Sequence, residues 1–161
     1  MKIMNKLQNK LKKANKDNKG FSLVELIIVI AIMAILVGIV GTQVIPYLNK
    51  SKLEKDRQLL SSYATAAVSA YTMEAGEIAA APASLDLYTG THTAGSDDEK
   101  LAKKIKELTY SGWPDVKDKF KSSEAKGATD VTIKYDTSKH TVTVTLKDAA
   151  TPDKLDVTAD L

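Results

Sequence analysis

The chain of 161 residues contains no cysteine, and this absence excludes several kinds of chemistry. No disulfide can hold the fold together, and no thiolate can bind a metal ion or attack a substrate. Neither of the two histidines, His92 and His140, lies in a pattern typical of catalysis. The sequence also lacks a glycine-rich phosphate loop and an HExxH metal motif. We therefore expect no enzymatic activity, no cofactor and no metal site.

A basic surface is also missing from most of the chain, although the net charge is +3. Of the 23 basic and 20 acidic side chains, seven lysines and one aspartate lie in residues 1–20, which leaves 16 basic and 19 acidic side chains. Because this remainder is mildly acidic, no nucleic acid is expected as a partner. Basic residues stay on the cytoplasmic side of a membrane, so residues 1–20 predict that a following span leaves the C-terminal part outside.

Charge is absent altogether from the 20 residues Leu26–Ile45. As a helix, this run spans roughly 30 Å, enough to cross the hydrocarbon core of a bilayer. Glu25 stands directly before it and Phe21 lies a little further upstream. A carboxylate in an apolar segment is costly unless it is neutralised or paired, so Glu25 is a candidate functional residue. A secretory signal peptide fits poorly, because its apolar region is shorter and ends at a small-residue cleavage site. An ordinary signal anchor is the alternative.

The residues GFSLVE (Gly20–Glu25) follow a lysine-rich segment and precede the unbroken apolar run. This arrangement resembles the type IV pilin family, in the wide sense that includes pseudopilins. The resemblance implies that a prepilin peptidase cuts between Gly20 and Phe21 and that Phe21 is then N-methylated. Residues 1–20 would be a cleaved cytoplasmic leader, 21–46 a transmembrane and polymerisation helix, and 47–161 an extracellular head. Ser22 stands where many members have threonine, and we expect little consequence from this departure.

The family resemblance also implies a role for Glu25, which pairs with an N-terminal amine during assembly. Its own chain's Phe21 is four residues away, a separation that places both on one helix face. The resemblance favours the amine of a neighbouring subunit instead. A third interpretation is that Glu25 only marks the interfacial end of the span, with its carboxylate in water.

The function implied is that of a structural subunit of a type IV pilus filament. Such a subunit is a single-pass protein of the cytoplasmic membrane with its C-terminus outside. The type IV pilus machinery then assembles it into an extracellular homo-oligomer that supports adhesion, motility or surface attachment. A minor pilin acting as a binding module and a pseudopilin of a type II secretion or competence machine are the alternatives. Many Gram-negative pilins close their C-terminal region with a disulfide. Because this chain has no cysteine, its head resembles the cysteine-free heads of pilins of Gram-positive bacteria more closely.

Helix-weakening residues gather where the apolar run ends, at Gly38, Gly41 and Pro46. Glycine weakens a helix by about 1 kcal/mol relative to alanine, and Pro46 cannot donate a backbone hydrogen bond to the carbonyl of Thr42. These residues predict either a harmless kink or a soft segment that unwinds when subunits pack. The family resemblance favours the soft segment.

The remaining chain predicts a head of mixed helix and strand. A helix is expected from Tyr47 to about Ala75, with an apolar stripe formed by Leu53, Leu60, Tyr63, Ala64, Ala67 and Tyr71. Together with the apolar run it would make one helix of about 55 residues, roughly 80 Å long. Residues 76–95 contain glycine and proline and predict an exposed loop.

Further along, Ser96 and Glu99 form a capping-box pattern before a short helix. The acidic residues Asp97–Glu99 suit the first turn of that helix better than a calcium site. We expect Trp113, in a Gly-Trp-Pro turn, to anchor a loop on the head.

The last part of the chain has the alternating pattern of strands. Residues 131–135 and 141–147 predict a hairpin around a turn at 136–139, and Leu155 and Val157 suggest a third short strand. The fold class is therefore α+β: a long N-terminal helix, transmembrane in its first half, packed against a small antiparallel sheet as in type IV pilins.

Overall fold

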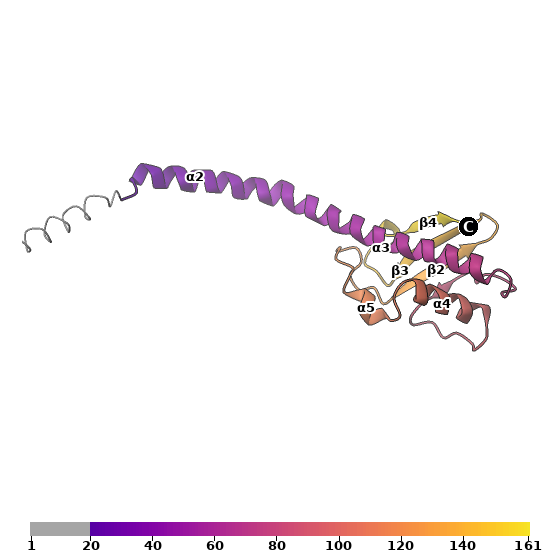
Figure 1. The fold of residues 1–161 in the computed structure, drawn as a ribbon. Helices are drawn as coiled ribbons and strands as arrows, with labels where there is room; N and C mark the ends of the chain where they lie inside the picture. The colour runs from indigo at the N-terminus through magenta and orange to yellow at the C-terminus, as the bar shows by residue number, and fades with distance from the viewer. Residues whose placement is uncertain (1–19) are drawn as a thin grey trace, which may run out of the picture. The chain divides into compact units, whose positions relative to one another are not determined.

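A computed structural model describes residues 20–161 of the chain, which divides into two compact units after Ile45. The described part of the first unit contains α2 (Leu23–Ile39) and a π-helix, η1 (Val40–Val44). α3 (Ile45–Glu74) begins at the boundary, and the other elements of the second unit form the α+β head (Figure 1). Apart from Gly20, the expected leader lies outside the described residues. The expected cleavage and membrane boundaries stay predictions.

α3 provides one wall of the core of the head. Because its buried apolar residues recur at steps of three and four, one face of the helix covers the core. The alanines on this face let the rest of the head approach the helix closely. The buried residues of the expected stripe are Leu60, Tyr63, Ala64 and Ala67, and Leu53 and Tyr71 are partly buried against the same core.

A four-stranded antiparallel sheet in the order β1-β2-β3-β4 forms the facing wall. Its strands are β1 (Leu85–Asp86), β2 (Asp130–Asp136), β3 (Thr141–Lys147) and β4 (Val157–Asp160). The Tyr135 hydroxyl on β2 donates to the Ala67 carbonyl of α3 at 3.3 Å. The Tyr71 and Tyr135 rings lie 5.8 Å apart, centre to centre. These contacts pack the sheet on α3 and confirm the α+β fold class.

Two parts of the sheet differ from the sequence expectation. The expected loop 76–95 contains β1, whose Leu85 lies opposite Ile133 of β2. A strand of two residues is too short to show the alternation from which strands are predicted. At the other edge, η2 (Pro152–Lys154) is a 3₁₀ helix and Leu155 is buried in the core outside any strand. The final strand therefore begins only at Val157.

Two short helices complete the head. α4 (Asp97–Leu108) begins after Ser96, whose hydroxyl accepts from the Glu99 amide at 3.2 Å. The Glu99 carboxylate accepts from the Gly95 amide rather than from Ser96, so only half of the expected capping box is present. α5 (Trp113–Lys117) begins at the expected turn, and the Trp113 ring is partly buried against the core.

Two buried aspartates hold the loops of this cysteine-free head. Asp56 on α3 is 1% exposed and accepts from the Lys121 and Ser122 amides and from the Ser122 hydroxyl, at 2.6–3.1 Å. Asp130 accepts in the same way from the amides of Tyr88 and Thr89. A buried carboxylate is stable only when its oxygens are hydrogen-bonded, so each aspartate fixes the position of the loop that it contacts.

Candidate functional site

The expected cleavage site lies in exposed, non-helical chain. Gly20 and Phe21 precede α2, and the Phe21 side chain is 85% exposed. Apart from Gly20 itself and its chain neighbours, no atom of the described chain lies within 4 Å of the place where a Cβ on Gly20 would stand. Exposed chain outside secondary structure is where proteases cut most readily. The Gly20–Phe21 bond is thus accessible to a peptidase in the uncut chain, and its cleavage stays a prediction.

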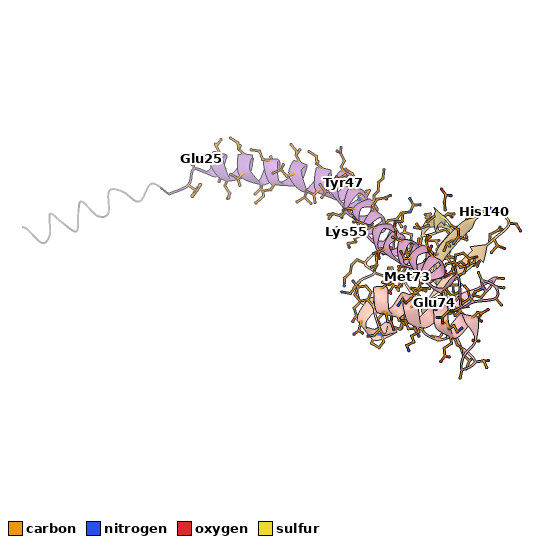
Figure 2. The ribbon with its side chains drawn as sticks, turned by 45° about the vertical axis from the view of Figure 1, so that its right-hand side comes forward. Glu25, Tyr47, Lys55, Met73, Glu74 and His140 are labelled. Atoms are coloured by element: carbon orange, nitrogen blue, oxygen red, sulfur yellow. The ribbon has the colours of Figure 1, made fainter. Side chains whose placement is uncertain are left out.

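Glu25 lies in the first turn of α2 (Figure 2) and takes part in the helix cap. The Ser22 amide donates to Glu25 Oε2 at 2.8 Å, and the Ser22 hydroxyl accepts from the Val24 amide at 3.3 Å. Both halves of a capping box are present, which satisfies amide groups that the helix itself leaves without partners. The Glu25 carboxylate is therefore oriented by its own chain before any subunit contact forms.

The structure changes the geometry expected for a pair between Glu25 and Phe21. α2 begins only at Leu23, so in the uncut chain Phe21 lies before the helix and not on one of its faces. The same-face argument for a pair within one chain does not apply to this state. Pairing with a neighbouring subunit and a purely interfacial role of Glu25 both stay open.

Sequence reasoning gave Ser22 too little weight. Little consequence is expected from serine at this position, yet its amide bonds to the carboxylate that the family resemblance singles out. The signal was present in the sequence, because Ser22 and Glu25 have the S-x-x-E spacing of a capping box.

The apolar helix behind this cap is not covered by any of the residues 20–161 that the structure describes. No residue of α2 is buried, and the helical run Leu23–Glu74 contains an 18-residue window of mean hydropathy 3.2. Such a surface, apolar on every side, is stable in lipid or among other helices and not in water. By length and composition, this helix is able to cross a membrane.

The predicted soft segment coincides with the π-helix η1. The Ile45 amide donates to the Val40 carbonyl, five residues back, instead of to Gly41, four residues back. Pro46 has no amide hydrogen, so it cannot donate to either neighbouring carbonyl of this turn. π-turns inside α-helices are rare and often mark functional positions. The chain is helical throughout this segment, and whether it unwinds during assembly stays a prediction.

Packing within the chain does not explain the two glycines. Apart from the neighbouring residues and the backbone of its own helix turns, a Cβ added to Gly38 or Gly41 would meet no atom of residues 20–161 within 4 Å. The Thr42 hydroxyl donates to the Gly38 carbonyl at 3.1 Å. This contact is to the backbone, so any residue at position 38 could make it. In this chain alone the glycines only weaken the helix.

The acidic residues at the start of α4 have a structural role. Asp97 Oδ2 accepts from the amides of Ala79 and Ala80, at 2.9 and 3.2 Å. These bonds fasten the segment after α3 to the first turn of α4. Asp97 is therefore a clamp of the same kind as Asp56 and Asp130.

Comparison with known proteins matches the N-terminal part of the chain to a family model. Residues 15–41 match the family model of the prokaryotic N-terminal methylation motif. No curated protein and no solved structure gives a significant match to the chain. The match covers the Gly20–Phe21 bond, Glu25 and most of the apolar helix. The chain therefore carries the class III signal of type IV pilin-like proteins, followed by a long apolar helix.

Proposed function

We propose that this type IV pilin-like chain is a structural subunit of a type IV pilus filament. Prepilin peptidase cuts between Gly20 and Phe21, Phe21 is N-methylated, and subunits polymerise through residues 21–46. The observation that carries the proposal is the match over residues 15–41 together with an apolar helix that no described residue covers.

The physical argument concerns what covers α2. Before assembly the helix is covered by lipid. The methylation motif and the apolar run both support this membrane location. In a filament, the same surface is covered by the helices of neighbouring subunits. Between lipid and protein the hydrophobic effect changes little, so close packing and polar pairing decide whether helices associate. Gly38 and Gly41 leave room for close approach, and Glu25 supplies the polar group.

The Glu25 carboxylate favours assembly and sets the axial position of each subunit. In lipid it carries a desolvation penalty, which a positive α-amine on a neighbour's Phe21 would remove. Such a pair neutralises two charges in a low-dielectric bundle and fixes the axial position of the incoming subunit. The proposed role is structural and requires no catalytic residue.

Blocking the cleavage site tests this function in cells. We expect Gly20→Leu to leave an uncut precursor in the membrane and to abolish surface filaments, because a bulky side chain would occupy the position next to the scissile bond. Gly76→Leu is the matched control, since Gly76 is also exposed with open space around it. Filaments that persist at normal yield in the Gly20→Leu strain would contradict the proposal. A pseudopilin would be processed in the same way but would be scarce in sheared surface filaments.

A further inference from the structure

The π-helix η1 leaves one backbone carbonyl, that of Gly41, without either of its helical donors. In an α-helix this carbonyl accepts from the amide four residues ahead, but the Ile45 amide donates to Val40 instead. In a π-helix it accepts from the amide five residues ahead, and that residue, Pro46, has no amide hydrogen. The Gly41 carbonyl is therefore an unused acceptor in the middle of a helix.

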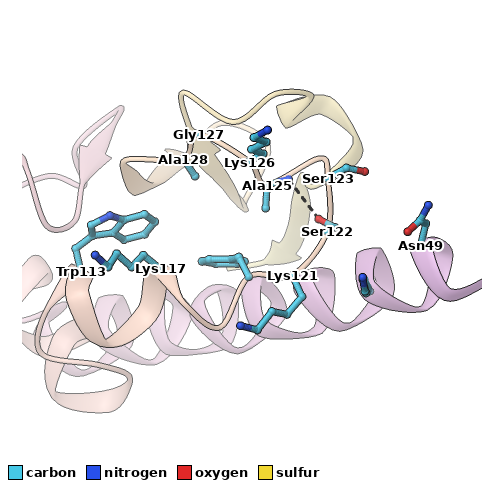
Figure 3. A pocket seen from close by; sticks show the side chains of 12 residues that line it. Asn49, Trp113, Lys117, Lys121, Ser122, Ser123, Ala125, Lys126, Gly127 and Ala128 are labelled. Atoms are coloured by element: carbon cyan, nitrogen blue, oxygen red, sulfur yellow. Dashed lines mark hydrogen bonds between the residues drawn. The ribbon is translucent and has the colours of Figure 1, made fainter.

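Side chains of the described residues do not supply the missing donor. The Thr42 hydroxyl donates to the Gly38 and Ile39 carbonyls, at 3.1 and 3.4 Å, and no other side chain of residues 20–161 reaches the unused carbonyl. In the head, by contrast, polar groups in irregular segments are paired. The Ser122 hydroxyl accepts from the Ala125 amide at 3.2 Å, as the dashed line in Figure 3 shows. Every buried side-chain polar atom of residues 20–161 likewise has a partner.

The surroundings of Gly41 make a missing donor costly. The residue lies within the uncharged run Leu26–Ile45, for which we propose lipid or neighbouring helices as the cover. A backbone carbonyl without a partner in such surroundings costs a free energy comparable to that of a lost hydrogen bond. Gly41 has no side chain to shield its backbone, and small residues let another helix approach closely. The carbonyl is thus accessible to a donor from another molecule.

The same run contains one unused donor, the carboxamide of Gln43. Thr42 and Gln43 are the only clearly polar side chains in Leu26–Ile45, and the Thr42 hydroxyl is occupied. The Gln43 side chain is exposed and makes no hydrogen bond within residues 20–161. Its NH2 group carries two donors, which are also costly to leave unpaired in apolar surroundings. Each copy of the helix therefore presents a complementary acceptor and donor.

We propose that in the filament the Gln43 carboxamide of one subunit donates to the Gly41 carbonyl of a neighbouring subunit. The inference rests on the proposed assembly through residues 21–46. A second copy of this chain is the occupant, because lipid tails offer no donor and the uncharged run offers only Gln43. The donor lies on one subunit and the acceptor on the next, so the contact repeats as a head-to-tail interface. It pairs two polar groups that a single subunit in lipid leaves unpaired, and so favours association of the helices.

Solid-state NMR of mixed filaments tests the contact directly. One set of subunits carries ¹³C at the glycine carbonyls and the other carries ¹⁵N in the glutamine side chains, so magnetisation transfer reports only contacts between subunits. We expect transfer over about 4 Å, the distance from the carbonyl carbon to a hydrogen-bonded nitrogen. It should persist in Gln58→Met filaments, because Gln58 is the other glutamine after Gly20.

Two outcomes of this measurement would overturn the proposal. The first is the absence of transfer in mixed filaments. The second is transfer from doubly labelled subunits diluted among unlabelled ones, because it would place the hydrogen bond within one chain.

Two matched substitutions test whether the bond promotes assembly. Gln43→Met keeps the length of the side chain and removes both donors, so filament yield relative to the membrane pool should fall at least about threefold. Thr42→Val removes a neighbouring hydroxyl that is occupied within its own chain, and its yield should stay near normal. Both variants should be inserted in the membrane and cut after Gly20. Equal yields from the two variants would contradict the proposal.

Pro46→Ala connects the effect of Gln43 to the Gly41 carbonyl. An amide at position 46 restores a regular helix, in which the carbonyl has a donor from its own chain. In this background Gln43→Met should lower the filament yield less than it does in the unmodified chain. An undiminished effect would show that Gln43 acts elsewhere and would overturn the assigned acceptor. Absence of filaments from the unmodified chain would contradict the proposed function itself, a result distinct from filaments that form without this contact.

Discussion

At the scale of single residues, the carboxylate of Glu25 has one observed role, in the helix cap, and one proposed role, in docking. Glu25 caps its own helix through the Ser22 amide, and it is the charged group at the start of an otherwise uncharged run. Capping needs only an oxygen that accepts a hydrogen bond, whereas docking with an amine needs the negative charge. The two roles can be separated by substitution.

Glu25→Gln separates them, because glutamine also serves in a capping box. We expect the variant to be stable, inserted in the membrane and cleaved, but its filament yield should fall at least about tenfold, since the neighbour's amine is left buried without a partner. Filament yield is measured in sheared surface fractions against the membrane pool. Ser22→Ala is the control, because it weakens the cap and keeps the charge. Near-normal filaments from Glu25→Gln would show that Glu25 is only an interfacial residue.

A second residue-scale prediction concerns the Asp56 clamp. Asp56→Ala leaves the Lys121 and Ser122 amides and the Ser122 hydroxyl without their acceptor, so it should lower the free energy of unfolding of the head by about 3 kcal/mol. Thermal unfolding of the detergent-solubilised chain measures this loss. Asp118→Ala, at an exposed position on the same segment, should cost less than about 0.5 kcal/mol. An equal effect of the two substitutions would refute the clamp.

At the scale of elements, periodic sequence patterns predict the long helices and strands and miss the short ones. The stripe on α3 and the alternation in β2 and β3 extend over several repeats, so the hydrophobic period identifies them. β1 has two residues and η2 has three, and no period is visible over that length. The Asp56 clamp was missed for another reason: Asp56 and Ser122 are 66 residues apart in sequence. Only the fold shows that Asp56 is buried and meets Ser122.

The π-helix η1 leads to a prediction for the apolar helix. Replacing Gly38, Gly41 and Pro46 with alanine adds a backbone donor and about 1 kcal/mol of helix propensity at each glycine. We expect a regular α-helix through 40–46 with slower hydrogen exchange in detergent, together with reduced filament assembly. Exchange rates unchanged by the substitutions would contradict the account of η1. A filament reconstruction of the unmodified protein with unbroken helix through Val44 would contradict unwinding on assembly.

At the scale of the whole molecule, the head contains the core and the apolar run contains the proposed polymerising surface. All apolar core residues lie between Leu60 and Leu155, whereas the exposed large apolar side chains are concentrated before Tyr47. We therefore expect a fragment that begins at Tyr47 to be soluble and monomeric. Circular dichroism of this fragment should show both helix and strand. Aggregation of the fragment would mean that the boundary between the two parts is wrongly placed.

The buried tyrosines make the head sensitive to alkaline pH. Burial raises the pKa of the Tyr63 phenol, and the Tyr88 side chain raises it further; burial also raises the pKa of the Tyr135 phenol. Because the folded state keeps these protons while the unfolded chain loses them, stability is full below about pH 10 and falls above it, by up to about 1.4 kcal/mol per tyrosine and pH unit. Thermal unfolding at rising pH measures the decline. Tyr135→Phe should make it less steep, and a pH-independent melting temperature above pH 10 would contradict this role of burial.

The central claim is that the chain is cut after Gly20 and assembled into a filament through the helix that follows. The most direct measurement is the intact mass of this chain in sheared surface filaments, with fragmentation of its N-terminus. Our account predicts that the chain dominates the filament and begins at N-methylated Phe21. A chain that begins at Met1 or after residue 45, or that is absent from the filaments, would contradict it.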